Sequence, residues 1–456
     1  MNRPGTATGR RKLLVLAAGA AAAALTAPAA RAAPAARPGP AESAAGTGDS
    51  AVVRALERAA HPLRSTEPGG RTDDLRALGS MVGDARVVGV GEATHGSHEF
   101  FAMKERVFRH LVEERGFTTF ALEMSWSAGL RIDEFLQGGP GDARTVAATA
   151  LRGSPWEREE FVSLIAWMRD HNRRNPQRPV HFMGDDLGGP GLGGDIFDRV
   201  LSSVRATRPE SLPELTELYA ALRPLDDIFA HLRRPLAERR HDAALAQRAL
   251  DLVAAHEGAG GEAYGWTVQH ARNIAQTFAF ATFDLADPGS VTAAERLRDQ
   301  AMADNVLWWQ RRTGHRMLLS AHNGHVGYLS TDPSMYPRTQ GAVLRERLGR
   351  AYAAVGFSFA GGAFLTKDTS LGGEWQPVRV PQAAPGSNEH TLDRVRHRDF
   401  YLDLRTAPAP ARDWLDRARP VHDAGSVFKP DLPDLALGRA YDVLVHLHRV
   451  RAADRL

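Results

Sequence analysis

Acidic and imidazole side chains follow four separate apolar runs in this sequence. The four segments are residues 91–96 with Glu92 and His95, residues 119–123 with Glu123, residues 184–186 with Asp186, and residues 321–325 with His322 and His325. Charged groups are costly beside buried strands unless they are paired or functional. Their recurrence after four apolar runs therefore indicates one shared functional cluster.

Such a cluster has the chemistry needed for general-base hydrolysis of an ester. A neutral imidazole has a pKa near working pH, so it can take a proton from water as that water attacks a carbonyl carbon. We expect His95 to be this base, with Glu123 or Glu92 as the carboxylate that orients it. His322 or His325 would then donate to the developing oxyanion or protonate the leaving alkoxide.

Each of these residues, taken alone, also has a structural explanation. Glu92 could cap a following helix, and His95 could be an ordinary turn residue. Glu123 is harder to explain in this way, because a carboxylate at the end of an apolar run must be paired, hydrogen-bonded or shifted in pKa. The combination of the four segments is what favours a functional site.

The elements around these segments predict an α/β fold. From Ala51 onward, short apolar runs alternate with amphipathic stretches, which is typical of βα units around a mostly parallel sheet with flanking helices. The predicted strands are residues 86–91, 118–123, 179–183, 316–321 and 351–359. Because ligands bind beyond the carboxyl ends of parallel strands, this fold would gather the four segments at one edge of the sheet.

One domain, residues 51–456, is expected to carry the catalytic site. Residues from about 188 to 310 have long Ala-, Leu-, Arg- and Glu-rich stretches and few β-branched runs, which predicts a helical insertion or subdomain. Helices are expected there over residues 243–256, 267–278 and 294–311. In the Pro-rich and charge-rich chain after Phe364, only residues 393–404 and 411–417 stand out as elements, the second as a helix.

The first 32 residues have the features of an export signal. Residues 10–12 (Arg-Arg-Lys) precede an apolar stretch that ends at the small-residue site 30–32 (Ala-Arg-Ala). Paired arginines predict the twin-arginine route and an extracellular or cell-envelope location, with an uncleaved membrane anchor as the alternative. Residues 33–50, rich in Ala, Pro, Gly and Ser, predict a disordered linker.

Charge and cysteine content narrow the classes of partner and cofactor. The formal net charge is +3, but residues 1–32 carry basic side chains and no acid, so the remaining chain is nearly neutral and gives no indication of a nucleic-acid partner. The chain has no cysteine, which excludes disulfides, a thiol nucleophile and a thiolate zinc site. We expect a small-molecule ester as the partner and no cofactor, although a metal held by His, Asp or Glu stays open.

Several segments resemble the erythromycin esterase family. They are residues 91–101 (GEATHGSHEFF), 116–123 (GFTTFALE) and 321–325 (AHNGH), with residues 298–305 (RDQAMADN) similar to a further motif. The resemblance spans most of the chain after the signal and implies hydrolysis of a macrolactone ester with His95 as general base. It also implies Glu92, Glu123, His322 and His325 as site positions.

Four further residues are expected to bind the substrate. Where we associate an active-site arginine with the family, this chain has Lys104, which keeps the charge but loses the bidentate fork. Asp186, Arg298 and Asn323 are the other expected substrate contacts. For Arg298 a solvated helix face is an equal alternative.

Three other interpretations compete with this one. Residues 356–360 (Gly-Phe-Ser-Phe-Ala) approach a serine nucleophile elbow, but they depart at the last residue and precede no evident helix. A metal-assisted hydrolase would use the same histidines and carboxylates as ligands, although no His-Glu-x-x-His helix is present. A secreted protein that binds a ligand without turning it over would not require the acid/base cluster.

Overall fold

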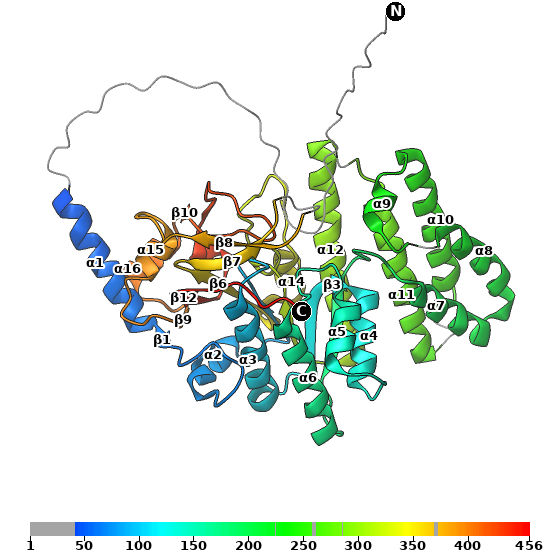
Figure 1. Cartoon of the computed structure of the whole chain (residues 1–456), viewed down its shortest axis with the longest axis horizontal. Coiled ribbons are helices and arrows are strands. Elements are labelled where there is room, and N and C mark those ends of the chain that lie inside the picture. Colours follow the sequence, from blue (N-terminus) through cyan, green and yellow to red (C-terminus); the bar gives the residue numbers. More distant parts are fainter. Residues whose placement is uncertain (1–41, 224, 258–260, 285, 369–372) are drawn as a thin grey trace, which may run out of the picture.

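The computed structural model describes residues 42–223, 225–257, 261–284, 286–368 and 373–456 (Figure 1). The export signal predicted over residues 1–32 lies outside these ranges. Residues 42–50, which were predicted to belong to the linker, instead form the start of helix α1 (Glu42–Ala59). The later part of this helix packs on the body through the buried residues Val53, Ala55 and Leu56. Within the described ranges, no helix is both long and apolar enough to cross a membrane.

An eight-stranded sheet forms the centre of the molecule, in the order β1-β9-β12-β6-β2-β5-β3-β4. The strands are β1 (His61–Pro62), β2 (Val87–Val90), β3 (Thr119–Ser125), β4 (His181–Asp186), β5 (Met317–Ser320), β6 (Tyr352–Phe359), β9 (Phe400–Asp403) and β12 (Val443–Leu447). The six strands from β12 to β4 are parallel. At one edge, β9 pairs antiparallel with β12, and β1 pairs antiparallel with β9. The predicted mostly parallel α/β sheet is confirmed, as are all five predicted strands.

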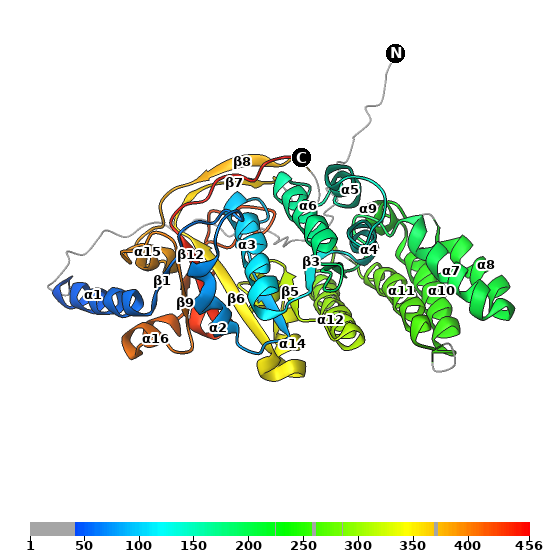
Figure 2. The same ribbon diagram turned by 90° about the horizontal axis from the view of Figure 1, so that it is seen from below.

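The parallel strands are buried on both faces, which explains their nearly continuous apolar sequence. Along β5, Leu318 and Leu319 point into two different core clusters, and Val88 and Val87 do the same along β2. Figure 2 shows α3 (His98–Arg115) and α6 (Glu159–Arg174) on one side of the sheet and α12 (Pro288–Thr313) and α14 (Gln340–Leu348) on the other.

The remaining elements lie around this sheet. On the body are α2 (Arg76–Val82), α4 (Trp126–Leu136), α5 (Ala143–Ala150), α13 (Asn323–Val326), α15 (Asn388–Leu392), α16 (Ala409–Leu415) and α17 (Leu437–Ala440), with short strand pairs β7 (Gly362–Thr366) with β8 (Gln376–Val380), and β10 (Arg419–Pro420) with β11 (Asp434–Leu435). Short 3-10 turns lie at Asp73–Leu75, Pro209–Ser211 and Gly349–Ala351.

The helical insertion gathers at one end of the molecule, beyond α12 (Figure 1). It consists of α7 (Gly194–Thr207), α8 (Leu212–Leu222), α9 (Ile228–Leu232), α10 (Leu236–Ala254) and α11 (Gly261–Phe280). The three helices predicted in this region coincide with α10, α11 and α12, although α10 ends two residues before the predicted end.

Candidate active site

The predicted site segments meet because their strands are neighbours. Strands β2, β5, β3 and β4 lie side by side in that order and run parallel, so their carboxyl ends share one edge. Glu92 and His95 follow β2, His322 follows β5, and Glu123 and Asp186 lie in the last residues of β3 and β4. The structure therefore brings together the four segments that the sequence analysis singled out.

His95 is oriented by Glu92 and by the backbone. Its Nδ1 lies 2.6 Å from Glu92 Oε1, and its backbone N–H donates to Gly425 O at 2.9 Å. Burial would raise the pKa of Glu92, but the charge of Lys104 and the hydrogen bond to His95 outweigh it, so this pKa lies below its ordinary value. An ionised Glu92 accepts the proton of Nδ1, which leaves Nε2 as the basic nitrogen of the ring.

Lys104 lies behind Glu92 and not at the substrate side. It is 1% exposed, and its ammonium donates to Glu92 Oε2 and, at 3.2 Å, to Ala321 O. The structure therefore places Lys104 behind Glu92 and not at the substrate-contact position predicted for it. Because helix α3 carries Lys104 under the sheet edge, the side chain holds Glu92 in place and links the β2 and β5 loops.

His322 lies next to His95, with their ring centroids 5.1 Å apart. Its Nδ1 accepts the Gly324 N–H at 3.1 Å, which places the ring proton on Nε2, and Nε2 is 3.0 Å from Asp423 Oδ1. Burial would lower the pKa of His322, but the negative charge of Asp423 raises it overall. His322 therefore presents an N–H at the edge of the space beside His95.

Gly425 keeps that space open. Its φ is +50°, and a Cβ built on it would lie 3.8 Å from His322 Nε2 and 3.9 Å from His95 Nε2. One point is thus close to the reactive nitrogen of both rings. Asp423 and Gly425 come from the Pro-rich C-terminal region. They do not follow a predicted strand, so the sequence analysis missed both.

Glu123 is the hub of the carboxylate network, not the partner of His95. Its Oε1 lies 2.9 Å from Arg298 Nη2 and 3.3 Å from His325 Nε2, and its Oε2 accepts the His322 N–H at 2.9 Å. Burial would raise the pKa of Glu123, but the charges of His325, His95 and Arg298 hold it well below the ordinary value. Of the two candidates for orienting His95, the structure selects Glu92.

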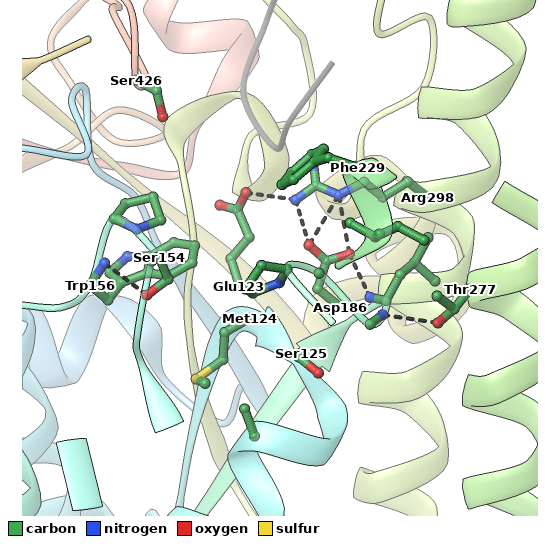
Figure 3. A pocket seen from close by; sticks show the side chains of 18 of the residues that line it. Glu123, Met124, Ser125, Ser154, Trp156, Asp186, Phe229, Thr277, Arg298 and Ser426 are labelled. Atoms are coloured by element: carbon green, nitrogen blue, oxygen red, sulfur yellow. Dashed lines mark hydrogen bonds and ion pairs between the residues drawn. The ribbon is translucent and has the colours of Figure 1, made fainter. Parts of the chain in front are cut away.

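Arg298 joins the ends of β3 and β4 from helix α12. Its Nε lies 3.0 Å from Asp186 Oδ2 and its Nη2 lies 2.6 Å from the same oxygen, in addition to the bond to Glu123 (Figure 3). It is 4% exposed, so the alternative of a solvated helix face is wrong. Burial would lower the pKa of Arg298, but Asp186 and Glu123 raise it overall.

His325 and Asn323 have positioning contacts. His325 Nδ1 lies 2.8 Å from Asp299 Oδ1, and although burial would lower its pKa, Glu123 and Asp299 raise that pKa well above the ordinary value. A histidine held as a cation between two carboxylates cannot serve as a base. The Asn323 side chain donates to Phe357 O at 2.8 Å and accepts the Phe357 N–H at 3.0 Å. It therefore connects α13 to β6, although a substrate contact was predicted for it.

Two pockets flank this cluster, and they are similar in size, with about 1120 and 1130 Å³ of empty volume including their open mouths. The first, here called the apolar pocket, is lined by Glu123, Met124, Trp156, Asp186, Arg298 and residues of α9 and α11 (Figure 3). The second, the histidine pocket, is lined by His95, His322, His325, Asp423 and Gly425. The Trp156 ring, which lines the apolar pocket, contacts the His95 ring, which lines the histidine pocket, edge-on at 5.6 Å between the ring centroids.

The rival serine and metal sites fit the geometry less well. Ser358 lies within β6 and is fully buried, and β6 leads into strand β7, whereas a nucleophile elbow requires a helix. Among the described residues, the group of His and carboxylate donors that lie within 4.8 Å of one another is His98, Glu160 and Asp454. The histidines and carboxylates around His95 are not part of that group, since they are spread over separate ion pairs.

Comparison with known proteins places the chain in a family. A family model described as erythromycin esterase matches residues 112–450, a range that begins after Glu92 and His95. Erythromycin esterase type II of Escherichia coli is 23% identical over 382 residues, which are 76% of this chain and 87% of that protein. The putative hydrolase YbfO of Bacillus subtilis is 28% identical over 136 residues, 29% of this chain and 28% of that protein.

Solved structures share the fold. A Bacillus cereus protein superposes with a TM-score of 0.81 at 27% identity, covering 90% of this chain and 99% of that one. A mutant of erythromycin esterase EreC in its open conformation superposes with a TM-score of 0.66 at 17% identity, covering 86% of this chain and 97% of that one. With the family model matching most of its length, the chain belongs to the erythromycin esterase family of hydrolases.

Proposed function

We propose that this protein hydrolyses a carboxylic ester by general-base activation of water at His95. The observation that carries the proposal is the His95–Glu92 pair: Nδ1 is held at 2.6 Å by an ionised carboxylate, and the ring lines a pocket beside His322. This arrangement leaves Nε2 free to accept a proton and stabilises the imidazolium that forms.

The reaction consumes one water molecule. Water attacks the ester carbonyl carbon and gives one proton to His95 Nε2, while the Nε2–H of His322 donates to the oxyanion. The C–O bond to the alcohol then breaks, and His95 returns the proton to the leaving alkoxide. Glu123 and Arg298 hold the His322 loop and the ends of β3 and β4 in place during these steps.

A macrolide lactone is the substrate class we propose first. In support, the apolar pocket is bordered by Ile228, Phe229 and Leu232 of α9 and by Phe280 of α11, which suit a large apolar ring. Erythromycin esterase relatives carry that activity in their names.

The test is incubation of the purified protein with a panel of macrolides, simple lactones and aryl esters, followed by mass spectrometry. We expect at least one compound to gain the mass of one water with the parent protein and not with His95→Ala. Recovery of every compound intact would refute hydrolysis and favour a protein that only binds its ligand. Dialysis against a chelator is the second arm, since activity that is lost on chelation and restored by a divalent cation would replace the metal-free mechanism.

We also propose that residues 1–32 export the protein, on the strength of the paired arginines and the Ala-Arg-Ala site. Cell fractionation tests this proposal. Replacing Arg10 and Arg11 by lysine should retain the protein inside the cell, and N-terminal sequencing of the exported protein should begin after Ala32.

A further inference from the structure

Buried hydrogen-bond donors that lack acceptors lie at one end of the apolar pocket, in Trp156, which lines it, and in Arg158, which packs on the lining residue Trp375. Trp156 is 3% exposed, and its indole N–H has no partner among the described residues. Arg158 is 4% exposed, and its Nε and Nη2 likewise have none, since only Nη1 donates, to Glu157 O at 2.7 Å. Buried donors without acceptors are costly in proteins, so these groups favour a bound molecule that supplies acceptor oxygens.

Two cations share one aromatic ring at the same end. Arg158 Cζ and Lys367 Nζ each lie 5.0 Å from the centroid of Trp375. Burial lowers the pKa of Lys367, and the charge of Arg158 lowers it further. Burial also lowers the pKa of Arg158 to about 10, against the opposing charges of Glu160 and Glu157.

No carboxylate of the described residues forms an ion pair with Lys367 or Arg158. The carboxylates of Glu157 and Glu160 favour the charge of Arg158 from nearby, but neither carboxylate accepts a hydrogen bond from its guanidinium. The half-buried Lys367 and the indole N–H of Trp156 at the pocket end, with the buried Arg158 behind Trp375, favour an anion with several acceptor oxygens.

The backbone fixes this pocket end relative to His95. The Leu365 N–H donates to Gly96 O at 3.0 Å, and a Cβ on Gly96 would lie 2.0 Å from Leu365 O, so β7 packs directly against the loop of the base. Two residues further, the Lys367 N–H donates to Ser426 O at 2.9 Å. The Trp156 ring contacts His95, and Trp156 lines the same pocket as Lys367 and Trp375.

We propose that Lys367, Arg158, Trp156 and Trp375 form a subsite for an anionic oxygen group on the substrate, a carboxylate, sulfate or phosphate. The inference rests on the proposed ester hydrolysis and not on the macrolide substrate: within the ester class it favours esters whose acidic substituent reaches the pocket beside Trp156. A neutral or cationic ester, a macrolide lactone included, supplies no anion to Lys367, Arg158 and the Trp156 N–H, so it is the poorer substrate.

Binding without turnover is the first test. Isothermal titration calorimetry compares succinate and inorganic phosphate with neutral succinamide, in the parent, in Lys367→Met and in Arg379→Met. Arg379 is exposed on β8, which pairs with β7 next to Lys367. Arg379→Met is therefore a control that removes one positive charge outside the proposed subsite. We expect at least one anion to bind the parent and Arg379→Met alike, at least tenfold more weakly to Lys367→Met, and succinamide not to bind.

Absence of anion binding to the parent, or equal affinity in Lys367→Met, overturns the subsite. Which anion binds identifies the acidic group. Because this assay needs no catalysis, it separates the subsite from the proposed function: anion binding without ester cleavage defeats the hydrolase proposal alone.

Kinetics with matched esters is the second test. The ratio of kcat/KM for mono-4-nitrophenyl succinate to that for 4-nitrophenyl butyrate reports on the acidic group. We expect this ratio to fall about tenfold in Lys367→Met, mainly through KM, and to stay at the parental value in Arg379→Met. An equal ratio in all three proteins contradicts the assignment while leaving ester hydrolysis intact.

Discussion

Two arrays of catalytic residue types lie in the same sheet, and only one of them faces a pocket. At the carboxyl end of β2, His95 is paired with Glu92 and lines the histidine pocket. Between β6 and β12, Ser358 Oγ lies 2.9 Å from His446 Nδ1, and His446 Nε2 lies 3.6 Å from Asp393. The second array has the residue types of a serine triad.

Both arrays contain residue types that are used in catalysis, but only the array at His95 is accessible from a pocket. Ser358 and His446 are opposite each other in the register of β6 and β12, and both are fully buried. Burial lowers the pKa of His446 despite the neighbouring Asp393, so the ring stays neutral, and the serine hydroxyl is the hydrogen-bond partner of its Nδ1. A polar group inside the sheet is stabilised by its partner, whereas one beyond the strand end remains available for chemistry.

Replacing His95 is expected to give the largest effect. His95→Ala should reduce kcat by about 10²- to 10⁴-fold, the usual contribution of a general base. Circular dichroism should show an unchanged fold. The comparison is Ser358→Ala, whose kcat per folded molecule should match the parent; a strong loss of activity in that variant would make the buried array catalytic and reverse the assignment.

Glu92→Gln should be nearly as damaging. The amide cannot hold the Nδ1 proton as an anion does, and Lys104 loses its counter-charge, so we expect kcat to fall by about 10²-fold or more. Since His95 and Glu92 act as one unit, the double variant should be no worse than His95→Ala. Multiplicative losses in steady-state kinetics would show that Glu92 acts independently of His95.

Asp423→Asn tests the partner of His322 and should have a smaller effect. Without the negative charge of Asp423, burial dominates and the pKa of His322 should fall below that of the parent, as NMR titration of the ring would show. We expect kcat to fall about tenfold, because the ring loses its orientation. An unchanged His322 pKa would mean that Asp423 does not act on this ring.

Ser358→Ala should lower the free energy of unfolding, whereas the previous variants should lower kcat. Removing the hydroxyl leaves His446 Nδ1 buried without a partner, which costs about 1–3 kcal/mol of unfolding free energy. Urea denaturation measures this loss. Unchanged stability would indicate that the array contributes nothing to the fold.

Much of the site follows from local sequence patterns. The apolar runs at β2, β3, β4 and β5 predict strands, and parallel order then gathers Glu92, His95, Glu123 and His322 at one edge. Which carboxylate serves which histidine could not be predicted, because Glu92 and Glu123 both follow apolar runs and differ only in the ion pairs that packing gives them.

The contacts that distant segments make with the site could not be predicted for a different reason. Asp423 and Gly425 reach the site through a loop without periodic sequence, and β12 joins the sheet only after the long C-terminal region has folded back. Lys104 and Asn323 occupy positions that suggest substrate contact, but their direction is set by tertiary packing against Glu92 and Phe357. Sequence spacing does not encode that direction.

Glu389 gives a pH signature in the free energy of unfolding. Burial raises its pKa to about 8, and its Oε1 accepts the His422 N–H at 3.1 Å beside Asp423. In the unfolded chain a glutamate releases its proton near pH 4.3. Between these two values the folded state binds one more proton than the unfolded state, so this group lowers the unfolding free energy as pH rises.

Glu389→Gln keeps the acceptor for His422 and has no proton to lose. The variant should therefore resemble the parent near pH 4.5 and be more stable at pH 8, with the gap growing by up to ~1.4 kcal/mol for each pH unit between. Urea denaturation at pH 5 and pH 8 measures this difference. Equal differences at the two pH values would show that Glu389 is already ionised in the fold, and then Asp423 would face a second negative charge that weakens its hold on His322.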